Sequence, residues 1–273
     1  MKCIQCSQSK VRDAGPAERE LERLIKAVVQ GTRFHSKVLA VGGYVRDELL
    51  GKEAADLDVV VALPYGAQRL CGLLQDVDPD VLVEPLALDY PVWHAVFPQD
   101  VTLDGQVFRV KGAELDAVDA QEAVWLNGEQ STQFGPVEED AKRRDFTVNT
   151  LLKDLSTGEI VDPTGLGRQD LASGTLRAIP NADSLRNFRE QPRQMLRLIR
   201  FMAQYGWMPS DDVVAALKAS VQHLADLTEH GLRKELGKLQ TKGLLNDALE
   251  LMRQYNMLAP MRAAWQKAKQ DAE

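Results

Sequence analysis

The chain has 273 residues, of which 44% are hydrophobic and 27% are charged, with a mean hydropathy of -0.27. This composition is typical of a folded globular protein and excludes an intrinsically disordered one. The formal net charge of -7 argues against broad, non-specific binding of nucleic acid, so any RNA contact must be local.

Signals for targeting and for disulfides are sparse. No apolar run approaches the roughly 20 residues that span a bilayer, and residues 1–15 lack the apolar stretch of a secretory signal. We therefore expect a cytoplasmic protein with no membrane partner. Cys3 and Cys6 form one C-x-x-C, but the histidines have no paired ligand spacing, so we interpret this segment as a terminal extension and not as a zinc site.

The first half of the chain alternates between helical and extended patterns. A helical pattern over 17–30 precedes an apolar run over 37–41, a glycine break and a short helix over 44–50. Further extended runs predict strands over 57–63, 81–84, 92–97, 106–110 and 113–118. Residues 121–136 have little periodicity, and we interpret them as a loop.

Helical patterns dominate from residue 138 onward, interrupted by a hairpin-like segment over 153–161. The expectation is an α+β fold, in which a small mixed sheet is flanked by helices and followed by an all-helical region. We place an N-terminal extension and helix at 1–36, a sheet-containing domain at 37–178 and the helical region at 179–273.

The strongest local feature is G-G-Y-V-R-D at 42–47, followed by Asp56-Leu57-Asp58 at the head of an extended run. Successive side chains on a strand point to opposite faces, so Asp56 and Asp58 share one face and can hold one or two divalent ions. The two glycines allow backbone N–H groups to approach phosphate oxygens beside a helix start. A lone D-x-D is commonly a solvated pair of aspartates, but the order of these three parts is much more specific.

A second charged segment, Arg143-Arg144-Asp145, follows about 85 residues later. The planar guanidinium groups suit phosphate, and Asp145 can accept a hydrogen bond from a ribose hydroxyl. A charged helix start is the alternative, but it explains neither the order of these residues nor their distance from the first motif.

The segment 190–201 predicts a helix that begins near Pro192. Three of its arginines recur at helical spacing and form one basic stripe, which is the expected meeting place for a polyanion. A plain solvated face is the alternative. The stripe consists of Arg193, Arg197 and Arg200. The opposite, packed face consists of Met195, Leu196, Ile199 and Met202.

These motifs, in this order, resemble the DNA polymerase β-like nucleotidyltransferases, and in particular the class II tRNA nucleotidyltransferases (CCA-adding enzymes) and bacterial poly(A) polymerases. The resemblance covers the chain from about Val38 to Gly206. It implies a nucleotidyltransferase head at 37–178 and a helical neck with a shortened body at 179–273. It also implies an enzyme that adds nucleotides from triphosphates, ATP and CTP, to the 3′ end of an RNA such as tRNA, without a template and with Mg²⁺.

The resemblance carries over to individual positions. Asp56 and Asp58 are expected to hold the metal and to be catalytic, with Asp116 as the third catalytic carboxylate and Glu114 and Asp119 as its rivals. The nucleotide is expected to bind to residues of the first, second and neck motifs, namely Gly42, Gly43, Arg46, Asp47, Arg143, Arg144, Asp145, Asn149, Glu190, Gln191, Gln194, Arg197 and Arg200.

Two other segments bear on this comparison. Residues 161–163 with Gly167 and Asp170 resemble the family's third motif, which joins head to neck, and we interpret them as structural. In the neck, Gln191 and Gln194 stand where the family has an aspartate and an arginine that read the base.

Three functions remain open. The first is transfer to an RNA 3′ end, as tRNA CCA addition, partial CCA addition or A-tailing. The second is a transferase that nucleotidylates a protein or a small molecule, which the acidic charge and the shortened helical part favour modestly. The third is a catalytically inactive RNA-binding relative, against which the intact D-x-D and R-R-D argue. The sequence does not fix the acceptor or the oligomeric state.

Overall fold

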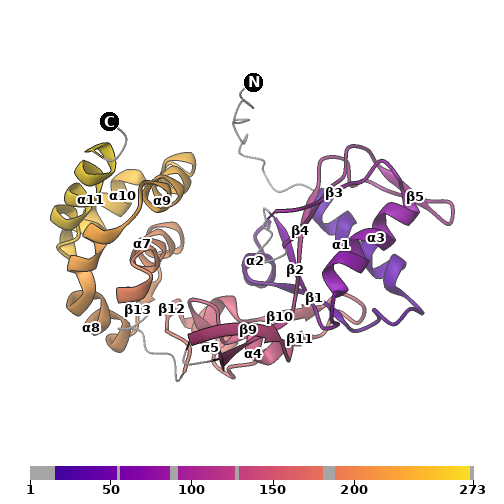
Figure 1. Ribbon diagram of the computed structural model, residues 1–273, viewed down its shortest axis with the longest axis horizontal. Helices are drawn as coiled ribbons and strands as arrows, with labels where there is room; N and C mark the ends of the chain where they lie inside the picture. The colour runs from indigo at the N-terminus through magenta and orange to yellow at the C-terminus, as the bar shows by residue number, and fades with distance from the viewer. Residues whose placement is uncertain (1–15, 54–55, 87–91, 127–128, 181–187, 271–273) are drawn as a thin grey trace. The chain divides into compact units, whose positions relative to one another are not determined.

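The computed structural model describes residues 16–270 except 54–55, 87–91, 127–128 and 181–187, so Cys3 and Cys6 lie outside the described residues. The chain divides into two compact units (Figure 1). The first consists of Met1–Asp140 with Leu152–Val161, and the second of Ala141–Leu151 with Asp162–Glu273. The expected domains at 1–36, 37–178 and 179–273 stay a prediction. In the described part, no helix is long and apolar enough to cross a membrane.

A seven-stranded sheet forms the centre of the first unit, in the order β11-β10-β1-β2-β7-β4-β3. Neighbouring strands are antiparallel, except that β2 and β7 are parallel. The mixed sheet of the expected α+β fold is therefore confirmed. Its strands are β1 (Val38–Val41), β2 (Leu57–Val61), β3 (Leu82–Pro85), β4 (Trp93–Val96), β7 (Glu114–Asp119), β10 (Leu152–Asp154) and β11 (Ile160–Val161).

Among the described residues, four helices accompany this sheet: α1 (Pro16–Val29), α2 (Gly43–Leu49), α3 (Gly66–Val77) and α4 (Val137–Ala141), the last of which ends at the boundary of the unit. α1 packs against α3, and α3 packs against β2, β4 and β7 (Figure 1). Leu70 and Leu74 of α3 are fully covered together with Leu57 and Leu115 of the sheet. α3 was not predicted from the sequence, because Gly66 and Gly72 lower the helix propensity there.

Two hairpins lie outside the sheet. β5 (Val101–Leu103) pairs with β6 (Gln106–Phe108), and β8 (Gln121–Leu126) pairs with β9 (Glu129–Phe134). The prediction of a loop over 121–136 is therefore wrong. β9 is mostly polar and β8 groups its apolar residues at 123–126, so neither strand shows the alternation of polar and apolar residues by which a strand is recognised.

A buried lysine ties α1, α2 and β10 together. Lys153 Nζ lies 2.8 Å from an oxygen of Glu22 and 2.8 Å from an oxygen of Glu48, and the hydroxyl of Tyr44 donates to Glu22 over 2.7 Å. Burial lowers the pKa of Lys153, but its hydrogen bonds to the two glutamates outweigh this and raise the pKa above its usual value. This network fixes α2, the helix that follows the glycine pair.

Helices dominate the second unit, which confirms the predicted helical region. α7 packs against α9 and α10, and α11 packs against α9 and η2. The predicted apolar face of α7 is buried at all four positions. The elements are η1 (Thr147–Asn149), α5 (Gly167–Ser173), β12 (Thr175–Leu176), α7 (Arg193–Tyr205), β13 (Met208–Pro209), α8 (Asp211–Ser220), η2 (Val221–Asp226), α9 (Glu229–Thr241), α10 (Leu245–Gln254) and α11 (Leu258–Gln270).

Candidate functional site

An acidic row crosses one face of the sheet in the first unit. Asp58 on β2 is exposed, whereas its neighbour Leu57 is buried against the opposite face. Asp58 is the register partner of Asp116 on the parallel strand β7. Paired residues of neighbouring strands share a face, so the two carboxylates stand side by side. Asp56 is also exposed and lies one residue before β2 begins.

The structure separates the three candidates for the third carboxylate. Asp119 is an odd number of residues from Asp116 and so points to the opposite face, where its Oδ1 accepts the backbone N–H of Ala67 at the start of α3 over 2.8 Å. Glu114 shares the face of Asp116 but lies at the first residue of β7. Asp116 is the candidate directly beside Asp58.

One neighbour of this row was missed by the sequence analysis. His94 on β4 is the register partner of Asp116, and its Nδ1 lies 2.7 Å from Asp116 Oδ1. No sequence signal could have found this contact, because the register of β4 against β7 brings together residues that are 22 positions apart.

The chemistry of these donors fits a magnesium ion. Mg²⁺ prefers oxygen ligands and is usually bound through one or two carboxylates, with water and substrate phosphates completing its six positions. Asp56, Asp58 and Asp116 supply carboxylate oxygens alone. Among the described residues, no group of three or more His, Cys, Asp or Glu side chains is placed so that it could hold a metal ion by itself. A magnesium site in which the phosphates of the nucleotide supply the remaining ligands does not require such a group of side chains.

The glycine pair forms a tight turn into α2. Gly42 has φ 65° and ψ -125°, a left-handed conformation that side chains disfavour. Arg46 is only 7% exposed, and its Nε and Nη2 each donate to Asp47 over 2.9 Å. The expected nucleotide contacts of Arg46 and Asp47 stay a prediction; in this structure the two side chains form an ion pair with each other.

In the second unit, the carboxylate of Asp145 is enclosed by donors. Its side chain is 6% exposed, and Oδ2 accepts from Arg197 Nε over 2.9 Å and from Nη2 over 2.7 Å. Oδ1 accepts from Asn149 Nδ2 over 2.7 Å and from the backbone N–H of Phe146 over 2.9 Å. Burial raises the pKa of Asp145. The positive charge of Arg197 and the hydrogen bonds lower the pKa by more than burial raises it, so the net shift is downward. A ribose hydroxyl would have to displace one of these donors.

The two arginines before Asp145 are more accessible than the aspartate. Arg143 is exposed and Arg144 is half-buried. They therefore remain the candidates for a direct contact with phosphate in this segment, and their role stays a prediction.

The arginines of α7 do not form an open basic stripe, and that prediction is wrong. Arg200 is 7% exposed, and its Nε donates over 3.0 Å to Glu235, which is itself 1% exposed. Arg197 is paired with Asp145. Of the three, Arg193 has no ion pair among the described residues. The balancing carboxylates come from distant segments, which is why no glutamates are interleaved along the helix.

The glutamines that depart from the family pattern contact each other. Gln194 Nε2 donates to Gln191 Oε1 over 3.3 Å, at the start of α7. The side-chain oxygen of Gln194, Oε1, is buried and accepts no hydrogen bond among the described residues. Glu190 and Gln191 are exposed. The pair thus offers amide groups without formal charge at these positions.

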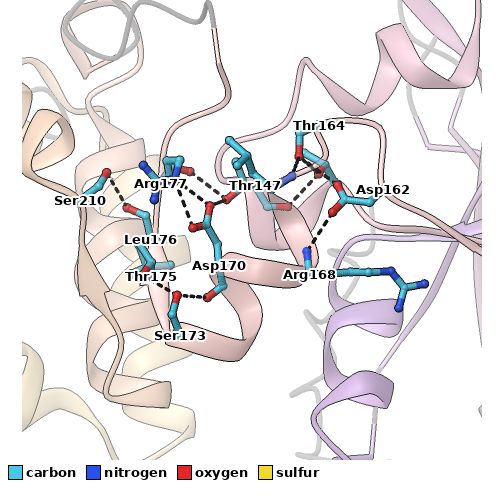
Figure 2. A network of polar contacts seen from close by, with 12 residues as sticks. Thr147, Asp162, Thr164, Arg168, Asp170, Ser173, Thr175, Leu176, Arg177 and Ser210 are labelled. Carbon is cyan, nitrogen blue, oxygen red and sulfur yellow. Dashed lines mark hydrogen bonds and ion pairs between the residues drawn. The ribbon is translucent and has the colours of Figure 1, made fainter.

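The third motif supports the second motif from within the same unit (Figure 2). Asp170 is 1% exposed and accepts from Thr147 Oγ1 over 2.6 Å and from Arg177 Nε over 3.0 Å. Asp162 accepts from Thr164 Oγ1 and from the backbone N–H of Arg168, each over 3.0 Å. These contacts agree with a structural role.

Gly167 lies against the backbone of the second motif. A Cβ added there would approach the carbonyl oxygen of Thr147 to 2.8 Å, which is closer than real side chains come. The absence of a side chain at Gly167 is therefore a packing requirement of η1.

Comparisons with known proteins agree with the motif order. Residues 38–177, about half of the chain, match the family described as Poly A polymerase head domain. A tRNA nucleotidyltransferase of Schizosaccharomyces pombe is 28% identical over 265 residues, covering 93% of this chain and 52% of that protein. Poly(A) polymerase I of Salmonella typhi is 29% identical over 248 residues, covering 88% and 50%. The chain spans about half the length of these curated relatives.

Solved structures show the same fold. A Thermotoga maritima CCA-adding enzyme complexed with tRNA CCA is similar with a TM-score of 0.66 at 25% identity, covering 92% of this chain and 53% of that chain. A tRNA nucleotidyltransferase complexed with a primer tRNA and an incoming ATP analog has a TM-score of 0.64 at 26% identity, covering 82% and 59%. Together with the acidic row and the R-R-D segment, these matches show that the chain belongs to the poly(A) polymerase head domain family of nucleotidyltransferases.

Proposed function

We propose that this protein is a template-independent RNA nucleotidyltransferase, which adds nucleotides from triphosphates to an RNA 3′ end with Mg²⁺. The observation that carries the proposal is the side-by-side placement of Asp58 and Asp116 on an open sheet face, in a chain of this family. Nucleotidyltransferases of this family generally depend on a metal ion.

The carboxylates of the first unit would hold the metal. Asp56 and Asp58 would bind it, and Asp116 would contribute the third carboxylate beside them. When bound, Mg²⁺ supplies a positive charge that favours attack of the 3′ hydroxyl on the α-phosphate and departure of pyrophosphate. No side-chain nucleophile is needed, because the RNA hydroxyl itself attacks.

The R-R-D segment would supply nucleotide contacts. Arg143 and Arg144 are the candidates for the triphosphate, since guanidinium groups donate paired hydrogen bonds to phosphate oxygens. Asp145 and Asn149 would keep this segment in a fixed conformation through Arg197, because these three side chains are already joined by hydrogen bonds.

A tRNA is the acceptor that the relatives favour. The solved structures named above include complexes with tRNA and with an ATP analog, and those ligands belong to those proteins. We propose the same classes of substrate here, ATP and CTP with a tRNA 3′ end. A cytoplasmic location is part of the same proposal, since it is where an RNA-processing enzyme of this kind would meet tRNA.

One assay tests the proposal. The protein is incubated with Mg²⁺, one labelled triphosphate at a time and a tRNA pool from which CCA has been trimmed. We expect label on RNA, with none when Asp58→Asn replaces the wild type. Label on protein or on a small molecule would instead support transfer to a different acceptor, and no label with any acceptor would support a catalytically inactive relative.

A further inference from the structure

His94 completes a row of three side chains across adjacent strands. It lies on β4 in register with Asp116 on β7, which is in register with Asp58 on β2. The three therefore share one face of the sheet, with Asp116 in the middle. His94 Nδ1 and Asp116 Oδ1 are 2.7 Å apart, which is a short hydrogen bond to a carboxylate.

The direction of this hydrogen bond follows from its chemistry. An ionised carboxylate has no hydrogen to donate, so the hydrogen lies on Nδ1 of His94. In the neutral imidazole, Nε2 is then without a hydrogen. The contact thus requires a defined tautomer of His94 whenever the ring is neutral and Asp116 is ionised.

The hydrogen bond also sets which way Asp116 faces. Oδ1 is held on the side of β4 by this contact, and Asp116 lies between β4 and β2, the strand that carries Asp58. The side chain of Asp116 is 42% exposed, whereas that of His94 is largely covered. An exposed aspartate rotates freely about its side-chain bonds, and a covered partner on the neighbouring strand restricts that rotation.

We propose that His94 is a positioning residue for Asp116, and that it restricts the rotation of the Asp116 carboxylate beside Asp58. This inference rests on the proposed function, in which Asp116 is the third carboxylate. A partner that orients an acidic side chain in this way affects the reaction without touching the nucleotide or the RNA.

Three variants isolate this role. His94→Leu removes the donor, whereas His94→Asn keeps an amide that can donate to Asp116. Glu84→Gln, which changes the register partner of His94 on β3, is the matched control. We expect His94→Leu to lower kcat about 10- to 100-fold with the nucleotide KM within about twofold. His94→Asn should recover most of the loss, and Glu84→Gln should match the wild type. Wild-type kcat in His94→Leu would overturn the proposal, as would a folded His94→Asn that is no better than His94→Leu.

Two further readouts do not depend on turnover. Binding of Mn²⁺ with a non-hydrolysable ATP analogue, followed by electron paramagnetic resonance, should weaken about tenfold in His94→Leu. Nitrogen NMR of the wild type should show the His94 hydrogen on Nδ1. If the wild type transfers nucleotides to no acceptor, the proposed function fails, while an unchanged Mn²⁺ affinity or a hydrogen on Nε2 overturns the role of His94 separately. Should His94→Leu fail to fold, His94→Asn and the wild-type tautomer carry the test.

Discussion

Asp145 and Arg197, which are 52 residues apart in the chain, are joined by two hydrogen bonds to the same carboxylate oxygen. Asp145 belongs to the R-R-D segment and Arg197 to α7. The pair therefore fixes the second motif against α7 within one unit. Two segments that are separate motifs in the sequence thus form one structural element.

Asp145→Asn is expected to lower the free energy of unfolding by about 3 kcal/mol at neutral pH, because Arg197 loses its counter-ion in a mostly covered position. Urea denaturation measures this loss. The matched control is Asp145→Asn with Arg197→Met, in which no unpaired charge remains. If the double variant is as unstable as the sum of the two single variants, the two residues are not coupled.

The same pair predicts how stability depends on pH. The pKa of Asp145 is depressed in the folded protein, so its contribution is fully present above the unfolded value of about 3.9 and is lost as pH falls through the folded value. The difference in unfolding free energy between wild type and Asp145→Asn should therefore be constant at neutral pH and shrink below about pH 4. A difference that is unchanged down to pH 2 would contradict this assignment.

Asp145→Asn should also leave the preference for ATP over dATP within about twofold of the wild-type ratio. A buried acceptor that binds a 2′ hydroxyl penalises the analogue that lacks it, but all four donors around Asp145 come from the protein itself. The ratio of kcat/KM for the two nucleotides tests this. Its collapse to about one in the variant would show a direct ribose contact.

Asp56→Ala and Asp58→Ala are expected to abolish transfer while leaving the melting temperature within about 2 °C, because both side chains are exposed and contribute to the reaction and not to the core. Thermal unfolding followed by the labelling assay checks both parts. Exposed Asp76→Ala, on α3, is the control. Wild-type transfer by both variants would remove the proposed mechanism.

The neck glutamines predict reduced discrimination between CTP and ATP, or tuning to a single nucleotide. Neither Gln191 nor Gln194 carries a charge, and charge-assisted hydrogen bonds are roughly twice as strong as neutral ones. Single-nucleotide incorporation on tRNA ending before, within and after CCA measures this, with Gln191→Asp plus Gln194→Arg as the comparison. Ordered addition of C, C and A followed by a clean stop in the wild type would show that the inference is wrong.

Gly167→Ala is expected to destabilise the protein by about 1–3 kcal/mol and to raise the nucleotide KM, because the new Cβ would push against the carbonyl of Thr147. Gly237→Ala on α9 is the matched control, since a Cβ there meets nothing within 4 Å and alanine is the better helix former. Equal stability of the two variants would contradict the close packing at Gly167.

The sequence predicted those elements whose pattern is local. The strand around Leu57, the short helix after the glycine pair and the buried face of α7 follow from alternation and helical spacing alone. The hairpin of β8 and β9 could not be found in this way, since its polar and apolar residues do not alternate. α3 was missed because its two glycines obscure a helix that the parallel pairing of β2 and β7 requires as a crossover.

Residues of the site were predicted by type, but their partners were not. Asp58 and Asp116 were identified as candidates from the chain, whereas their adjacency depends on the register between two strands. His94, Glu235 and the covered state of Arg200 depend on contacts over 22 and 35 positions. The spacing of residues in a single sequence does not predict contacts between side chains this far apart in the chain.

The path of the chain limits how this protein can be cut into fragments. It passes from the first unit to the second after Asp140, returns for Leu152–Val161 and leaves again. A fragment that stops at Asp140 would lack β10 and β11, so β1 would become a bare edge with unpaired backbone groups, and such edges invite aggregation. An expression fragment of the sheet unit must therefore extend through Val161, and a deletion series that ends earlier would report insolubility and not loss of a catalytic residue.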